Sequence, residues 1–202
     1  MIWTIPKIWN GDCFILGGGP SLKDFDVDRL KEKRVVAVNN SYSIAPWADV
    51  CYFMDAIWYE WHKKELLKNY HGILITTAKQ QKNNPNVMFL ERGPSRLGLA
   101  AEPHRLVRGT NAGYGAIGVA VHLGAKRIFL LGYDMRVVEG KHNWHEEHKR
   151  DVPTQVYKNQ FMGGYLSLPT PLEERKIEVF NATPGSLLDV FPKVDIEEIL
   201  GQ

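Results

Sequence analysis

Three histidines lie three residues apart in the polar stretch 141–151, which reads KHNWHEEHKRD. An imidazole has a pKa near neutrality and is the usual general base for removing a proton from a hydroxyl group. We therefore expect at least one of His142, His145 and His148 to be catalytic. A divalent metal is one alternative for such a cluster, although the zinc motif H-E-x-x-H is one residue too short here. The other alternative is a solvated loop. We expect no metal site.

A run of three glycines follows the apolar stretch 13–16, and the whole segment reads CFILGGGPSL. Glycine has no Cβ, so the backbone can turn sharply and a ligand can approach it closely. Gly17 and Gly19 fit the first two positions of the dinucleotide fingerprint G-x-G-x-x-G, but Leu22 occupies the third. No lysine follows at the spacing of a P-loop. The segment predicts a phosphate or nucleotide site of another kind, or else a tight turn without a ligand.

Mainly apolar runs indicate the strands that must position these residues, because strands buried on both faces of a parallel sheet have this pattern. Such runs occupy residues 13–16, 34–39, 49–54, 72–77, 87–90, 127–131 and 177–181. Helices are expected at 56–69, from 110 or 111 to 124, from Pro153 toward 166, over 187–200, and within 21–33 with Asp26 as N-cap. The alternation predicts a single α/β domain over 1–202, built as a three-layer sandwich with a mostly parallel sheet.

Two segments lack a regular pattern and are long for connections within a compact domain. Residues 91–109 contain glycine and proline breakers together with Arg92, Arg96, Arg105 and Arg108. Residues 135–152 contain the histidine cluster. Both segments are expected to form lid or active-site loops beside the sheet.

Polar residues follow the predicted strands at their carboxyl ends, where ligands bind in open α/β sheets. An asparagine amide both donates and accepts hydrogen bonds, which suits a base or a sugar, although any single Asn is also a common turn residue. We expect these residues to share one edge of the sheet and to form a polar cleft. They are Gly17, Gly18, Gly19, Pro20, Ser21, Asn39, Asn40, Asp55, Asp134 and Ser186, joined by Asn111 at the start of the glycine-rich helix.

The composition is that of an ordinary globular protein, with 44% apolar and 24% charged residues among 202. The formal net charge of +2 is spread along the chain and gives no electrostatic footprint for duplex nucleic acid. Cys13 and Cys51 lie in predicted buried strands and are expected to be reduced core residues. No apolar run reaches the ~18 residues of a membrane span, and the first residues lack the pattern of a signal peptide. A cytoplasmic location is expected, and the oligomeric state stays open.

The motifs GGGPSL, VNNSY, GTNAGYGAIGVAVHLGAKRIFLLGYDM and HNWHEEH resemble those of a known superfamily. It joins the bacterial sialyltransferases of the Campylobacter type with the archaeal 6-hydroxymethylpterin diphosphokinases, and the chain is most similar to small, phage-associated members. The resemblance covers roughly residues 12–200. It implies a Rossmann-like fold that binds a nucleotide donor at the carboxyl edge of the sheet. In the sialyltransferases the donor is CMP-sialic acid, and no metal is required.

The resemblance also implies roles for single residues. The family motif G-N-G-P-S-L matches residues 17–22, except that Gly18 replaces its Asn. The further matches are Asn39 in the second strand, Thr110 to Gly113 at the helix start, Gly132 with Asp134 after the sixth strand, and Pro184 with Ser186. Thr110 and Gly132 therefore join the expected nucleotide-binding residues.

The catalytic residues that the resemblance implies lie after the sixth strand. His148 is nearest by spacing to the family's catalytic histidine, and His145 is next. Met135 and Arg136 stand where the sialyltransferases carry tyrosines that help the phosphate to leave. We expect Arg136, or an arginine of the segment 91–109, to stabilise the developing negative charge instead. This departure leaves the transferred sugar undetermined.

Three functions remain open at this stage. The first is a glycosyltransferase-like enzyme that takes a nucleotide or nucleotide-sugar donor and a small-molecule or glycan acceptor, and needs no cofactor. The second is a diphosphokinase that moves pyrophosphate from ATP and needs Mg²⁺, with Asp55 and Asp134 as the metal ligands. The third is a nucleotide-binding or phage interaction protein without catalysis.

Overall fold

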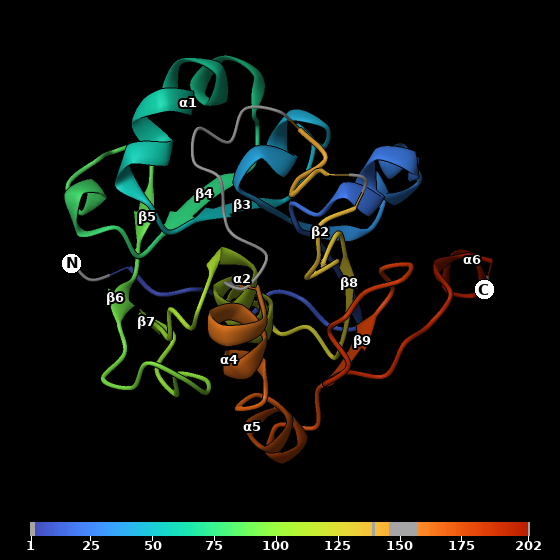
Figure 1. Ribbon diagram of the computed structural model, residues 1–202. Helices are drawn as coiled ribbons and strands as arrows, with labels where there is room; N and C mark the ends of the chain where they lie inside the picture. The colour runs from blue at the N-terminus through green and yellow to red at the C-terminus, as the bar shows by residue number, and fades with distance from the viewer. Residues whose placement is uncertain (1–2, 139, 146–156, 202) are drawn as a thin grey trace.

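A sheet of seven parallel strands forms the centre of the computed structural model, which describes residues 3–138, 140–145 and 157–201 (Figure 1). The strand order is β5-β4-β3-β2-β1-β8-β9, and every neighbouring pair is parallel. The strands are β1 (Asp12–Leu16), β2 (Arg34–Val38), β3 (Val50–Phe53), β4 (Ile73–Thr76), β5 (Met88–Phe89), β8 (Arg127–Leu131) and β9 (Glu178–Asn181). The predicted α/β fold with a parallel sheet is confirmed.

Alternate side chains of each strand point to opposite faces, and each face has its own apolar core. Cys13 and Ile15 belong to one core, which includes α2 (Ala112–Leu123), α4 (Gly163–Tyr165) and α5 (Pro169–Glu174). Phe14 and Leu16 belong to the other, with α1 (Ala56–Asn69) and α6 (Ile196–Leu200). Helices therefore cover both faces of the sheet and bury its continuous apolar surface from water, as a three-layer sandwich requires.

Helix α2 packs unusually close to the sheet because small residues face it. A Cβ on Gly115 would lie 2.6 Å from the hydroxyl oxygen of Tyr52 in β3. The helix begins after Asn111, whose Oδ1 accepts a hydrogen bond from the Tyr114 amide at 2.9 Å, and ends at Gly124 with a φ of +105°. The predicted boundaries and N-cap are confirmed, and the helix start lies at the carboxyl edge of the sheet.

The connections differ from the sequence expectation in three places. The segment 21–33 forms two short 3₁₀ helices, η1 (Pro20–Asp24) and η2 (Val27–Leu30), although Asp26 does cap the second by accepting from the Asp28 amide. The C-terminal helix is confined to α6, because Pro192 cannot donate a backbone hydrogen bond within a helix. The irregular segment 91–109 contains β6 (Glu91–Arg92) and β7 (Arg105–Leu106), which pair in parallel.

The remaining elements are short. They are η3 (Asn39–Ser43), η4 (Lys79–Gln81) and the π-helical η5 (Tyr157–Met162). The predicted helix between Pro153 and 166 is represented by η5 and α4, and its beginning lies outside the described residues. Across the described ranges, no helix combines the length and the apolar character needed to cross a membrane.

Candidate functional site

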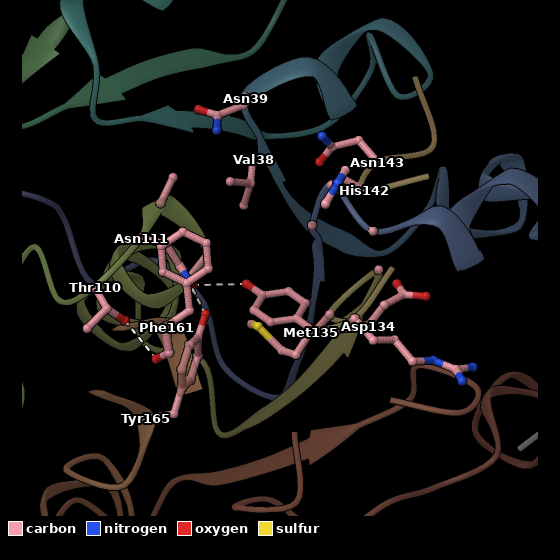
Figure 2. A pocket seen from close by; sticks show the side chains of 18 of the residues that line it. Val38, Asn39, Thr110, Asn111, Asp134, Met135, His142, Asn143, Phe161 and Tyr165 are labelled. Atoms are coloured by element: carbon pink, nitrogen blue, oxygen red, sulfur yellow. Dashed lines mark hydrogen bonds between the residues drawn. The ribbon is translucent and has the colours of Figure 1, made fainter. Parts of the chain in front are cut away.

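A cavity of about 310 Å³ opens at the carboxyl ends of β1 and β8 (Figure 2). From β1 the chain builds strands outward to β5 on one side, and it then returns to place β8 and β9 on the other side. Neighbouring connections thus leave the sheet in opposite directions between β1 and β8. Open α/β sheets bind their ligands at such a switch point, so the topology selects this cavity as the candidate site.

The glycine loop after β1 packs tightly against the loop after β8. Leu16 pairs with Leu131 in register, and Gly17 and Gly19 donate from their amides to the carbonyls of Leu131 and Gly132 at 2.7 and 2.8 Å. A Cβ on Gly17 would lie 2.6 Å from the Gly132 carbonyl oxygen, and one on Gly19 would collide with the Asp134 carboxylate. These two glycines are required by the contact between the loops.

Gly18 differs from its two neighbours. Its backbone lines the cavity, and a Cβ there would lie 3.1 Å from Oδ1 of Asn143. Its carbonyl accepts from the Trp144 amide at 3.1 Å, while its own amide has no acceptor among the described residues. Among the described residues, the amide of the middle glycine is therefore available to a ligand of the cavity.

Asp134 joins the loop after β8 to the loop after β1. Its Oδ2 accepts from the Ser21 hydroxyl at 2.8 Å, and its Oδ1 accepts from the Ser21 amide at 3.2 Å. The residue is only 2% exposed. Burial raises the pKa of the Asp134 carboxyl, and the Ser21 hydrogen bonds and the Arg136 charge only partly oppose this shift.

The N-terminus of α2 forms another wall, in which residues Thr110 to Gly113 line the cavity. Helix geometry leaves the first amides, here those of Ala112 and Gly113, without acceptors inside the helix. These N–H groups and the helix dipole favour a negative charge at this position. The Tyr165 hydroxyl fixes the wall by donating to Oδ1 of the Asn111 cap at 2.9 Å.

Arg136 supplies a positive charge at the cavity. Its guanidinium packs against the backbone at Gly185, where an added Cβ would collide with it. Its Nε is buried and has no hydrogen-bond partner among the described residues. The positive charge of this guanidinium at the cavity favours an anionic ligand there.

The predicted histidines are distributed unevenly. His142 and Asn143 line the cavity and lie across it from Thr110 and Phe161 (Figure 2). His145 is absent from the lining, and its ring packs edge-to-face on Trp144 with the centroids 5.0 Å apart. His148 lies outside the described residues. Within those residues, no three His, Cys, Asp or Glu side chains are grouped as a metal site would need.

The other predicted residues fall into two groups. Asn39, Asp55, Thr110, Asn111, Gly132 and Asp134 line the cavity with the three glycines, whereas Pro20, Ser21, Asn40 and Ser186 do not. Oδ1 of Asn40 accepts from the indole of Trp58 at 2.7 Å. The buried Ser186 hydroxyl donates to the Tyr133 carbonyl at 2.6 Å. These side chains support the loops instead of forming the cavity wall.

Two non-glycine residues of the lining have backbones in the left-handed region. Asn39 has a φ of 50° and Met135 a φ of 53°. Asparagine tolerates this conformation, but for a methionine it costs on the order of 1–3 kcal/mol. Asn39 lies directly after β2, and Met135 lies in the loop after β8, so both stand at the cavity.

Sequence reasoning missed several lining residues, namely Val38, Met54, Tyr133, Met135, Phe161 and Tyr165 as wall and Asn143 as a polar contact. Val38 and Met54 are the last apolar residues before the strand-end turns, so their position at the edge was an available signal. Phe161 and Tyr165 come from η5 and α4, and no local pattern indicates that these elements return to the cavity.

Comparison with known proteins gives one informative likeness. No known family matches the sequence, and no curated protein matches it. The fold is similar to the solved structure of the MAf glycosyltransferase from Magnetospirillum magneticum AMB-1, with a TM-score of 0.62 and 14% sequence identity. The match covers 96% of this chain but only 35% of that protein, so the chain spans about a third of its length. At this identity the likeness shows the fold alone, and function has to be argued from the site.

Proposed function

We propose that the chain is a transferase that binds a nucleotide-activated donor in the cavity between β1 and β8, and that the transferred group is a sugar. The observation that carries the proposal is the set of backbone donors around one cavity that have no acceptor among the described residues, namely the amide of Gly18 and the first amides of α2, together with the positive charge of Arg136. A row of N–H donors and a cation is the chemistry that recognises phosphate oxygens. The similarity to a glycosyltransferase fold is compatible with this function.

The donor phosphates would lie between the Gly18 amide and the N-terminus of α2. Asn39 and Asp55 line the same cavity and would contact the nucleoside, because an amide and a carboxylate can bond to sugar hydroxyls and to base edges. Arg136 would stabilise the leaving phosphate, since fixed donors act most strongly where charge develops.

A histidine of the segment 142–148 would act as the general base. His142 is the best-supported candidate because it lines the cavity, and His145 and His148 remain candidates from the sequence. In the transfer step the acceptor hydroxyl gives its proton to the imidazole, and its oxygen forms a bond to the anomeric carbon. The bond from that carbon to the phosphate oxygen breaks, and the nucleotide leaves with the electron pair.

A Mg²⁺-dependent transfer of pyrophosphate from ATP is the second candidate, because Asp55 and Asp134 both line the cavity. Mg²⁺ is usually held by one or two carboxylates together with substrate phosphates. Both oxygens of Asp134 already accept hydrogen bonds from Ser21, however, which leaves Asp55 as the freer carboxylate. The residues therefore fit a two-carboxylate metal site poorly.

A thermal-shift screen against CMP, UDP, GDP, ATP and CMP-sialic acid, each with and without Mg²⁺, tests the proposal. A ligand that binds the native state raises Tm, by an amount that grows with its concentration relative to Kd. Stabilisation by a nucleotide or sugar nucleotide without metal is expected, and the most effective one identifies the donor. Stabilisation by ATP only with Mg²⁺ would favour the second candidate. No shift with any nucleotide would contradict both and leave an interaction protein.

A further inference from the structure

Three arginines surround a second cavity of about 330 Å³ beside the first. It is lined by Arg92, Gly93, Pro94, Ser95, Arg96, Arg108, Gly109 and Thr110. Thr110 also lines the cavity at the switch point, so the two cavities share a wall. All three arginines belong to the segment 91–109, which the proposed transfer step does not use.

Backbone hydrogen bonds hold this cavity open. Strands β6 and β7 pair Arg92 with Leu106, and the Gly93 amide donates to the Leu106 carbonyl at 3.0 Å. The Gly109 amide then donates to the Arg96 carbonyl at 3.2 Å, where Gly109 has a φ of +65°. The arginine-bearing backbone is therefore held in place on both sides of the cavity.

The three guanidinium groups have no carboxylate partner within 4.0 Å among the described residues. Arg105 of the same segment does have partners, Glu102 at 3.4 Å and Glu91 at 3.8 Å. Partial burial and then the charge of Arg108 lower the pKa of Arg92, and the charges of Tyr52 and Asp55 oppose this shift. Among the described residues, the three arginines thus share one cavity without an ion-pair partner.

We propose that Arg92, Arg96 and Arg108 form a binding site for a phosphate group. A phosphate monoester carries close to two negative charges at neutral pH and presents three acceptor oxygens, which suits several guanidinium forks better than a singly charged carboxylate does. The side chains of Arg92 and Arg96 are exposed and that of Arg108 is half-buried, so the site is open to a ligand. The shared wall at Thr110 places this phosphate next to whatever occupies the first cavity. The site does not depend on the proposed function.

Titration of the protein with inorganic phosphate at constant ionic strength tests this site, with ¹⁵N–¹H NMR spectra as the readout. The amides of Gly93 and Gly109 are expected to shift in the wild type. The double variant Arg96→Gln/Arg108→Gln is expected to bind about a hundredfold more weakly or worse, because each of the two lost charge-assisted hydrogen bonds contributes on the order of 1.5–3 kcal/mol. Arg92 is kept in this variant because its Nε donates to the Thr77 carbonyl at 3.2 Å.

Arg105→Gln is the control, since it removes one positive charge from the same segment at an arginine that already has carboxylate partners. Its affinity should stay within about twofold of the wild type, as expected for a paired surface charge. Equal weakening in both variants would reduce the effect to general electrostatics and overturn the site. Shifts of the wild-type Gly18 amide instead of the Gly93 and Gly109 amides would also overturn the site. Equal shifts with acetate would overturn it too, because they would remove the preference for phosphate.

Discussion

The Ser21 hydroxyl donates to Oδ2 of Asp134 at 2.8 Å across the gap between the loops after β1 and β8. The Ser21 amide donates to the other carboxylate oxygen at 3.2 Å, so one side chain holds the start of η1 through two hydrogen bonds. These bonds join the two strands between which the topology of the sheet reverses. The geometry of the candidate site therefore depends on a pair of which only Asp134 lines the cavity.

Ser21→Ala is expected to lower the free energy of unfolding by about 1–3 kcal/mol, because a buried carboxylate loses its hydroxyl donor. Urea unfolding of the variant and the wild type measures this. Ser95→Ala is the control, since the Ser95 hydroxyl donates to the Leu97 carbonyl within an exposed loop, and it should change stability by less than about 0.5 kcal/mol. Equal effects in the two variants would contradict the supporting role of Ser21.

The raised pKa of Asp134 makes stability depend on pH. Between the ordinary carboxyl pKa and the raised folded value, the native state binds more protons than the unfolded state. Stability from this group is thus present at acid pH and is lost as the pH rises through the folded pKa. The wild type is expected to lose stability relative to Asp134→Asn over this window, as followed by urea unfolding from pH 4 to pH 7.5. A difference that is flat or of opposite sign would refute the assignment.

Gly115→Ala tests the close approach of α2 to the sheet. The new methyl would lie 2.6 Å from the Tyr52 hydroxyl oxygen, and overpacking of this kind costs about 1–3 kcal/mol. Gly163→Ala is the matched control, because a Cβ there meets no atom within 4 Å and alanine favours a helix by up to about 1 kcal/mol. Opposite changes in unfolding free energy are expected. Destabilisation by both substitutions to the same degree would mean that packing against Tyr52 is not the cause.

Gly18→Ala and Gly19→Ala are expected to separate ligand binding from folding. A Cβ on Gly18 lies 3.1 Å from the movable amide of Asn143, so this variant should keep its Tm within about 4 °C of the wild type, a change of under 1 kcal/mol. It should still weaken nucleotide binding, because the methyl stands beside the free amide. Gly19→Ala collides with the Asp134 carboxylate and should lower Tm markedly. The reverse order of Tm values would show that the loops are packed differently.

The strand-end residues could be predicted from the sequence because parallel strands deliver their carboxyl ends to one edge. The sequence could not show, however, which of two adjacent residues at a strand end faces the cavity. Asn39 lines it, while Asn40 is buried and bonded to Trp58, and this depends on the left-handed turn at Asn39. The sequence also indicates the glycine loop after β1. Residues 17 and 19, however, are glycine because they contact the loop after β8, and no local sequence pattern reveals that contact.

Residues contributed by distant elements were beyond sequence reasoning altogether. Phe161 and Tyr165 reach the cavity from η5 and α4, which follow residues 146–156 in the chain. The extended helix expected at the C-terminus was also wrong, because apolar spacing could not show that the segment before Asp195 instead pairs in parallel with β9 through the bridge between Asn181 and Lys193.

Nucleotide affinity of Arg136→Gln, measured by isothermal titration calorimetry with the best ligand of the thermal-shift screen, tests the central claim most directly. Arg136 lines the cavity, whereas the control Arg34→Gln removes the same charge at the start of β2, at the opposite edge of the sheet. The claim predicts a loss of about tenfold or more for Arg136→Gln, as for one charge-assisted hydrogen bond, and a change within about twofold for Arg34→Gln. Unchanged affinity in Arg136→Gln, or equal loss in both variants, would contradict a phosphate-binding site between β1 and β8.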